Sequence, residues 1–148
     1  MPTRSIALLV TAIIVFAGHG KAYAQESLIL TVVVSGATPG KGQAIGSLFD
    51  SKESYLKKPA QETIVVIDAT GRATFTFEGL AAQTYAVSVI YDEDSVGELD
   101  TGLFGIPKEL IAMSNNAKGR FGPPSFNKTK FDLHSNKTIE IRFGKAKE

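Results

Sequence analysis

The sequence contains no cysteine and no tryptophan, and it contains only two histidines. Without cysteine the chain forms no disulfide bond, so its core depends on side-chain packing alone. A histidine-rich zinc site and a Ser-His-Asp relay both need histidine, and His134 is the only one after residue 24. These absences argue against nucleophilic and zinc-dependent catalysis. They leave open whether the chain is an enzyme of another kind.

The sequence also lacks an excess of charge of either sign. Its 16 basic residues nearly balance its 15 acidic residues. Nucleic-acid binding requires a strongly basic surface, and nucleotide enzymes carry a glycine-rich phosphate loop that is missing here. We therefore expect no nucleic-acid partner.

The N-terminal segment has the three parts of a secretory signal peptide. Arg4 supplies a positive charge, Ile6 to Phe16 form an apolar run, and Ala22-Tyr23-Ala24 has the small-x-small pattern of a cleavage site. The apolar run is shorter than the ~20 residues that a spanning helix needs. We therefore predict a cleavable signal peptide over residues 1–24 and a single periplasmic or secreted domain over residues 25–148, with no membrane span after cleavage.

Short runs of β-branched and aromatic residues alternate with turn residues along the remaining chain. This pattern predicts seven strands. They cover residues 28–35, 43–49, 63–67, 73–77, 84–91, 130–134 and 138–143. The fold class is therefore all-β, a Greek-key β-sandwich of transthyretin-like or immunoglobulin-like type with one long ordered loop. We also expect two hairpins, one through Lys41-Gly42 and one through Ser135-Asn136.

Local patterns predict individual contacts within this sandwich. Phe75 and Phe77 lie two residues apart on one strand and should share a buried face. Leu80 and Tyr85 flank a tight turn that enters the next strand. This arrangement predicts that Leu80 closes one end of the core and that the Tyr85 hydroxyl bonds to nearby backbone as a tyrosine corner.

The first candidate site is the acidic loop of residues 92–100. Its aspartates alternate and a glycine stands at the sixth position, which is how a loop wraps oxygen ligands around calcium. Val96 at the fifth position and Leu103 at the twelfth offer no side-chain oxygen. The alternative is a solvated acidic turn whose side chains bond to their own backbone. The candidate metal ligands are Asp92, Asp94 and Asp100.

The second candidate site is the long segment of residues 103–126, which exceeds the length of an ordinary connection. An arginine among amides and glycines can hold a carboxylate, a phosphate or a sugar acid through two hydrogen bonds. We therefore expect a small anionic ligand or a protein partner. The alternative is that the amides satisfy the loop's own backbone while phenylalanines pin it to the sandwich. The candidate ligand-binding residues are Asn115, Asn116, Lys118, Arg120 and Phe121.

The chain from about Ser27 to Phe143 resembles the bacterial exported family known as domain of unknown function 2141. The resemblance is carried by Leu30 to Gly36 with Lys41-Gly42-Gln43, by Gly79 to Val87, by the acidic loop ending in Leu99-Asp100, by Phe104 to Glu109, and by Ser114 to Phe126. It implies a signal peptide and a sandwich fold, but no activity. The family's acidic loop commonly reads Asp-Glu-Asn-x-Asn-Gly-x-Leu-Asp. Here Asp94 retains an oxygen at the first asparagine position, and Val96 loses one at the second.

These observations favour an exported, non-catalytic binding or structural module with its contact surface in residues 103–126. An alternative is a structural module stabilised by calcium at the acidic loop. A third alternative is a small periplasmic hydrolase. The expected cofactor is therefore either none or Ca²⁺.

Overall fold

The structure is a computed structural model that describes residues 27–96 and 109–144. The predicted signal peptide of residues 1–24 lies outside the described residues. So do Asp100 and the first part of the predicted long loop, residues 103–108.

The described chain consists of strands joined by turns and two short helical segments. In order they are β1 (Leu28–Ser35), β2 (Gln43–Phe49), β3 (Gln61–Val66), β4 (Arg72–Leu80), β5 (Gln83–Asp92), β6 (Ile111–Met113), the 3-10 turn η2 (Ser114–Asn116), α1 (Phe126–Thr129), β7 (Phe131–Leu133) and β8 (Lys137–Arg142). No helix in these ranges is long and apolar enough to cross a membrane.

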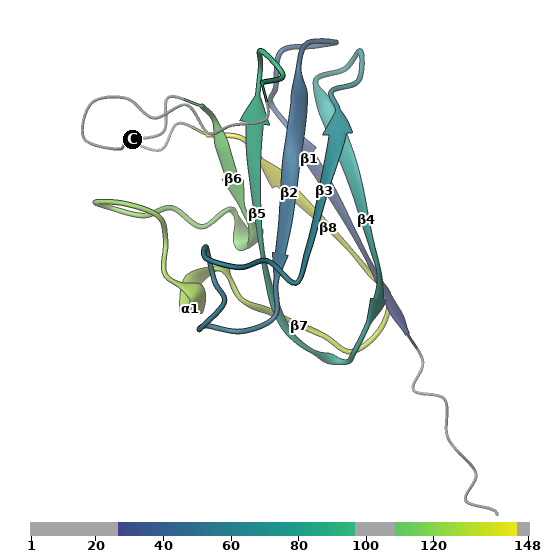
Figure 1. The fold of residues 1–148 in the computed structure, drawn as a ribbon, viewed down its shortest axis with the longest axis vertical. Helices are drawn as coiled ribbons and strands as arrows, with labels where there is room; N and C mark the ends of the chain where they lie inside the picture. Colours follow the sequence, from purple (N-terminus) through teal and green to yellow (C-terminus); the bar gives the residue numbers. More distant parts are fainter. Residues whose placement is uncertain (1–26, 97–108, 145–148) are drawn as a thin grey trace, which may run out of the picture.

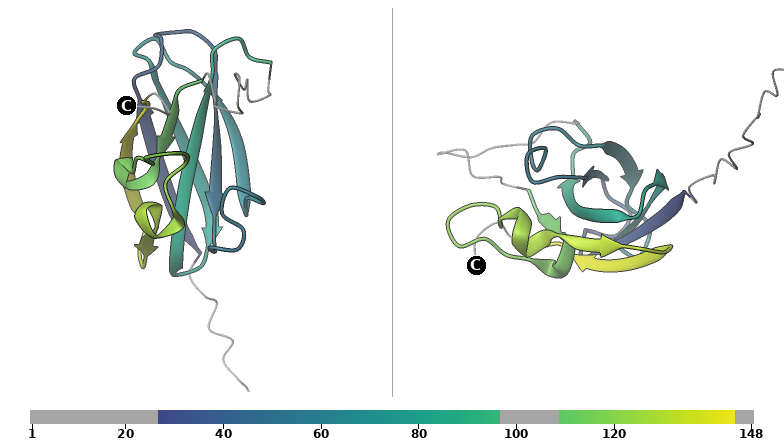
Figure 2. Two further views of the ribbon diagram at one scale, coloured as in Figure 1. Left: turned by 90° about the vertical axis from the view of Figure 1, so that its left-hand side faces the viewer. Right: turned by 90° about the horizontal axis from the view of Figure 1, so that it is seen from below.

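The strands form two sheets that pack face to face as a sandwich (Figure 1 and Figure 2). One sheet has the order β4-β1-β8. The other has the order β3-β2-β5-β6, with β7 also pairing to β5. The predicted all-β sandwich is confirmed. The described residues contain eight strands and not seven, because the three residues of β6 are too few to produce a recognisable alternating pattern.

The pairing of neighbouring strands differs from the prediction. β1 pairs with β4 and β8, whereas β2 pairs with β3 and β5, so the predicted hairpin through Lys41-Gly42 is wrong. β7 and β8 likewise pair with different strands, so the hairpin through Ser135-Asn136 is wrong as well. Turn residues allow the chain to reverse, but they do not determine which sheet the next strand joins. That choice depends on burying an apolar face against the opposite layer.

The core between the sheets contains the side chains that the alternating pattern selects. Phe75 and Phe77 are fully buried, and their rings stack with centroids 6.3 Å apart. The Tyr85 hydroxyl donates a hydrogen bond of 3.1 Å to the carbonyl of Ala81, and Leu80 is buried beside this turn. The predicted shared face and the predicted tyrosine corner are therefore confirmed.

Candidate functional site

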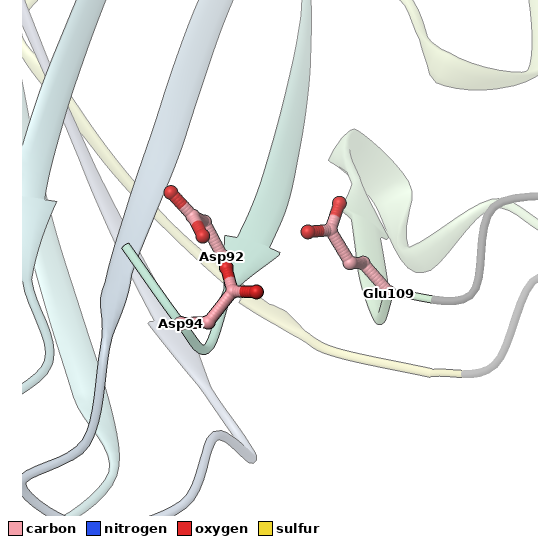
Figure 3. A group of neighbouring side chains, drawn as sticks. All are labelled: Asp92, Asp94 and Glu109. Atoms are coloured by element: carbon pink, nitrogen blue, oxygen red, sulfur yellow. The ribbon is translucent and has the colours of Figure 1, made fainter. Parts of the chain in front are cut away.

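Three carboxylates meet where β5 ends and the chain returns to β6. Each of Asp92, Asp94 and Glu109 offers an oxygen, and these oxygens lie within 4.8 Å of one another. Figure 3 shows the carboxylate of Glu109 pointing toward the two aspartates. We call this group the acidic corner.

The pairing of β5 with β6 explains why Glu109 reaches the aspartates. In this antiparallel pair Ile90 lies opposite Ile111. Asp92 comes two residues after Ile90, and Glu109 comes two residues before Ile111. The same register therefore places Asp92 opposite Glu109. The backbone N–H of Tyr91 bonds to the carbonyl of Leu110 at 2.9 Å, which shows that the register continues this far.

The two aspartates are held by neighbouring polar groups. Asp92 is fully buried, and its Oδ2 accepts a hydrogen bond of 2.7 Å from Nε2 of Gln43, its cross-strand neighbour on β2. The backbone N–H of Val96 donates to Oδ1 of Asp92 at 3.2 Å and to Oδ1 of Asp94 at 3.4 Å. These donors hold the two carboxylates in place at the end of β5.

Glu93 lies in the same loop but takes no part in the acidic corner. Its Oε1 forms an ion pair of 2.9 Å with Nζ of Lys41 and accepts a bond of 3.4 Å from the Thr38 hydroxyl. The hydrogen bond and the charge of Lys41 hold the pKa of Glu93 below its ordinary value, and Glu93 in turn raises the pKa of Lys41. These exposed contacts attach the loop to the turn before β2.

The geometry of the acidic corner suits one divalent cation. Calcium binds carboxylate oxygens at about 2.3–2.6 Å, so two oxygens on one ion lie up to about 5 Å apart. The separation of at most 4.8 Å lets all three carboxylates contact the same ion. Like charges this close repel one another, and a cation between them removes that cost. Calcium takes 6–8 oxygen ligands, so backbone or water oxygens would complete its shell.

The structure therefore brings together two of the three predicted metal ligands and places a third carboxylate, that of Glu109, beside them. Asp92 and Asp94 meet, and Asp100 lies outside the described residues. Glu109 was missed because it stands seventeen residues after Asp92, far beyond the twelve residues of a calcium loop. Recognising Ile111–Met113 as a strand paired with β5 would have located it.

The amides of the second candidate site bond within the chain. Nδ2 of Asn115 donates to the carbonyls of Lys128 at 3.1 Å and Lys130 at 2.9 Å. Oδ1 of Asn116 accepts a bond of 2.9 Å from the backbone N–H of Arg142. Both asparagines adopt left-handed backbone conformations, which asparagine tolerates better than most residues. These two amide groups thus fasten the loop, as the structural alternative expects.

Buried contacts attach η2 and α1, which flank residues 117–125, to β5 and to a small aromatic cluster. The Ser114 hydroxyl accepts a bond from the Val87 N–H at 3.0 Å and donates to the Thr129 carbonyl at 2.6 Å. Tyr55 packs edge-on against Phe126, with centroids 5.6 Å apart, and its hydroxyl donates to the backbone carbonyl just before α1, that of Pro124, at 3.0 Å. Burial also raises the pKa of the Tyr55 hydroxyl.

The tip of the same loop faces solvent. Lys118 and Arg120 are exposed, and 96% of the Phe121 side chain is accessible. We call these three residues the loop tip. Phe126 thus pins the loop as expected for an anchoring phenylalanine, whereas Phe121 does not. The loop tip follows β6 and η2 in the chain, whereas Glu109 of the acidic corner comes just before β6, so this strand separates the loop tip from the acidic corner.

The described chain is an all-β sandwich with an acidic corner and a projecting loop. Residues 32–141 match the family described as an uncharacterized protein conserved in bacteria, DUF2141, and the chain belongs to that family. No curated protein and no solved structure gives a significant match.

Proposed function

We propose that this chain is an exported, non-catalytic structural module that binds calcium at the acidic corner. The observation that carries the proposal is the meeting of Asp92, Asp94 and Glu109 within 4.8 Å, from both sides of the β5–β6 connection. Asp92 is fully buried and Glu109 is half-buried, so an ion there would be partly shielded from water. The signal-peptide pattern of residues 1–24 supports export to the periplasm or the medium.

A bound ion would tie the end of β5 to the start of β6. Extracellular calcium modules typically have dissociation constants of about 10⁻⁴–10⁻³ M. At about 10 mM calcium such a site stabilises the folded state by roughly 1.4–2.7 kcal/mol. For a domain of this size the melting temperature should then rise on the order of 5–10 °C.

The test compares thermal melts in about 10 mM calcium and in a chelator. Glu109→Gln should abolish the calcium-dependent rise, because it removes one negative ligand and leaves the shape unchanged. Glu93→Gln is the matched control, since Glu93 pairs with Lys41 outside the corner, and it should retain the rise. A melt of the unmodified protein that is the same in calcium and chelator would refute the proposal.

A second candidate is that the loop tip forms a contact surface for an anionic ligand or a protein. The exposed Phe121 supports it, because an aromatic ring left in water gains roughly 1.5–3 kcal/mol when a partner covers it. Arg120 and Lys118 add positive charge beside that ring. In a titration with inorganic phosphate or glucuronate, Arg120→Ala should lose binding and keep the melting temperature. Loss of folding in Arg120→Ala, or no binding of either anion by the unmodified protein, would end this candidate.

A further inference from the structure

β3 is an edge strand, and its solvent-facing side chains are mostly apolar. It pairs with β2 and stands at the end of its sheet, on the side of β2 away from β5 (Figure 1). Residues 63–67 read Thr-Ile-Val-Val-Ile, five β-branched residues in succession. Ile64 is 55% exposed and Val66 is 73% exposed. Such a segment pairs readily with another strand when its edge is open.

The hydrogen-bond register shows which backbone groups of β3 are open. The N–H of Ile67 bonds to the carbonyl of Gly42, which makes this a hydrogen-bonded pair. Pairs alternate along an antiparallel ladder, so residues 61, 63 and 65 also bond toward β2. The N–H and C=O groups of Glu62, Ile64 and Val66 point away from β2, toward the open edge of the sheet. Within residues 27–96 and 109–144, no group forms a hydrogen bond with them.

Neighbouring β4 leaves these groups unpaired. It approaches β3 through the turn after Asp68, where the Asp68 N–H bonds to the Arg72 carbonyl. It also approaches at the other end, where Nε2 of Gln61 bonds to the Glu78 carbonyl at 2.8 Å. The outward groups of β3 lie between these two ends.

The two edge strands of the opposite sheet, β4 and β8, carry the polar residues that discourage pairing. The exposed positions of β4 are Arg72, Thr74, Thr76, Glu78 and Gly79, and those of β8 are Lys137, Thr138, Glu140 and Arg142. β3 has no lysine and no proline, and Glu62 is its one charged residue. The Glu62 carboxylate already accepts a hydrogen bond of 2.7 Å from the Ser47 hydroxyl. β3 therefore lacks the protecting polar residues that β4 and β8 carry.

The outer face beside this edge carries a row of apolar side chains. Ile64 lies opposite Ile45, Ile45 opposite Ile90, and Ile90 opposite Ile111. Residues directly opposite in a sheet share one face, so the four isoleucines form a continuous row across β3, β2, β5 and β6. The row runs straight to the open edge at Ile64.

We propose that two copies of this chain associate through β3, antiparallel and with the two-fold axis at Ile64. In this register Ile64 faces Ile64 of the second copy, and Glu62 faces Val66. The three outward residues of each copy then pair completely, which gives six backbone hydrogen bonds, two for each of three pairs. No like charges face each other. A register centred on Glu62 would instead place the Glu62 carboxylates of the two copies opposite each other, which is unfavourable because like charges repel.

The same arrangement joins the two isoleucine rows into one row of eight. It makes the interface isologous, because the same patch serves both copies. The occupant of the edge is therefore a second copy of this chain, matched to it in hydrogen bonding, charge and apolar surface.

The test uses sedimentation equilibrium together with cysteine cross-linking. The unmodified protein should have twice the monomer mass, and Ile64→Lys should have the monomer mass. Thr74→Lys places the same charge on the exposed face of β4 and should remain dimeric. A monomeric mass for the unmodified protein at about 100 μM would overturn the proposal.

Cross-linking tests the register without a disruptive charge. The chain has no cysteine, so any disulfide in a single-cysteine variant joins two copies. Ile64→Cys places the two Cα atoms about 5.5 Å apart, within disulfide range, and should cross-link on mild oxidation. Position 66 is more exposed than position 64. In the proposed register, however, the two copies of residue 66 lie four residues apart along the strands, roughly 13 Å, so Val66→Cys should not cross-link by itself. It should cross-link when mixed with Glu62→Cys. Equal cross-linking of the Ile64→Cys and Val66→Cys variants would show random encounter and refute this interface.

Discussion

Replacing Gly42 with alanine tests the close approach between the turn before β2 and the acidic loop. Gly42 has φ +73°, and a Cβ there would lie 2.5 Å from the Asp92 carbonyl oxygen and 2.7 Å from Cα of Glu93. Both contacts are to backbone, so the acidic loop itself must move. Gly40 is the matched control, because it has φ +65° but nothing within 4 Å of a Cβ.

The two variants separate backbone strain from collision. The left-handed conformation costs an alanine about 1–2 kcal/mol at either site, and the stiffer unfolded chain returns about 0.4–1 kcal/mol. Gly42→Ala adds the cost of overpacking, about 1–3 kcal/mol. With a urea m-value of about 1–3 kcal/mol/M, the unfolding midpoint of Gly42→Ala should lie on the order of 1 M below that of Gly40→Ala.

The displaced loop also changes the acidic corner. Because Asp92 must move, Gly42→Ala should weaken the calcium-dependent rise in melting temperature, whereas Gly40→Ala should preserve it. Equal urea midpoints for the two variants would refute the close approach.

Two further measurements test the packing and electrostatics away from the corner. Tyr85→Phe removes the hydrogen bond to Ala81 and should lower the free energy of unfolding by about 0.5–1.5 kcal/mol, measured by urea titration; an unchanged midpoint would contradict the tyrosine corner. The pKa of Asp68 is held below its ordinary value by the Thr70 hydroxyl and by the backbone N–H groups of Arg72 and Thr70. A depressed folded-state pKa stabilises the protein above the unfolded-state pKa, and this contribution disappears as the pH falls through the folded-state pKa. Asp68→Asn should therefore show a shallower loss of stability between about pH 5 and pH 2 than the unmodified protein, and an identical slope would contradict this role.

Part of each candidate site could be predicted from local sequence. Asp92 and Asp94 lie two residues apart, so their proximity follows from chain connectivity and the loop pattern identifies both. Glu109 depends on the pairing of β5 with β6, and three residues of strand give too weak a pattern to reveal that pairing. In the long loop, composition identified Asn115 and Phe121 alike as candidates. Only the folded arrangement shows that Asn115 bonds to backbone while Phe121 faces solvent.

The sequence by itself determined the class of fold and much of the core. The period of two in β4 places Phe75 and Phe77 on one face, and the turn before Tyr85 closes through the bond to Ala81. Both features depend on residues near one another along the chain. Tertiary structure decided which strands are neighbours, which carboxylates meet and which edge stays open. β1 and β2 follow each other in sequence yet belong to different sheets, because each buries its apolar face against the opposite layer. The open edge at Ile64 arises in the same way, since it exists only because no further strand of the described sandwich pairs with β3.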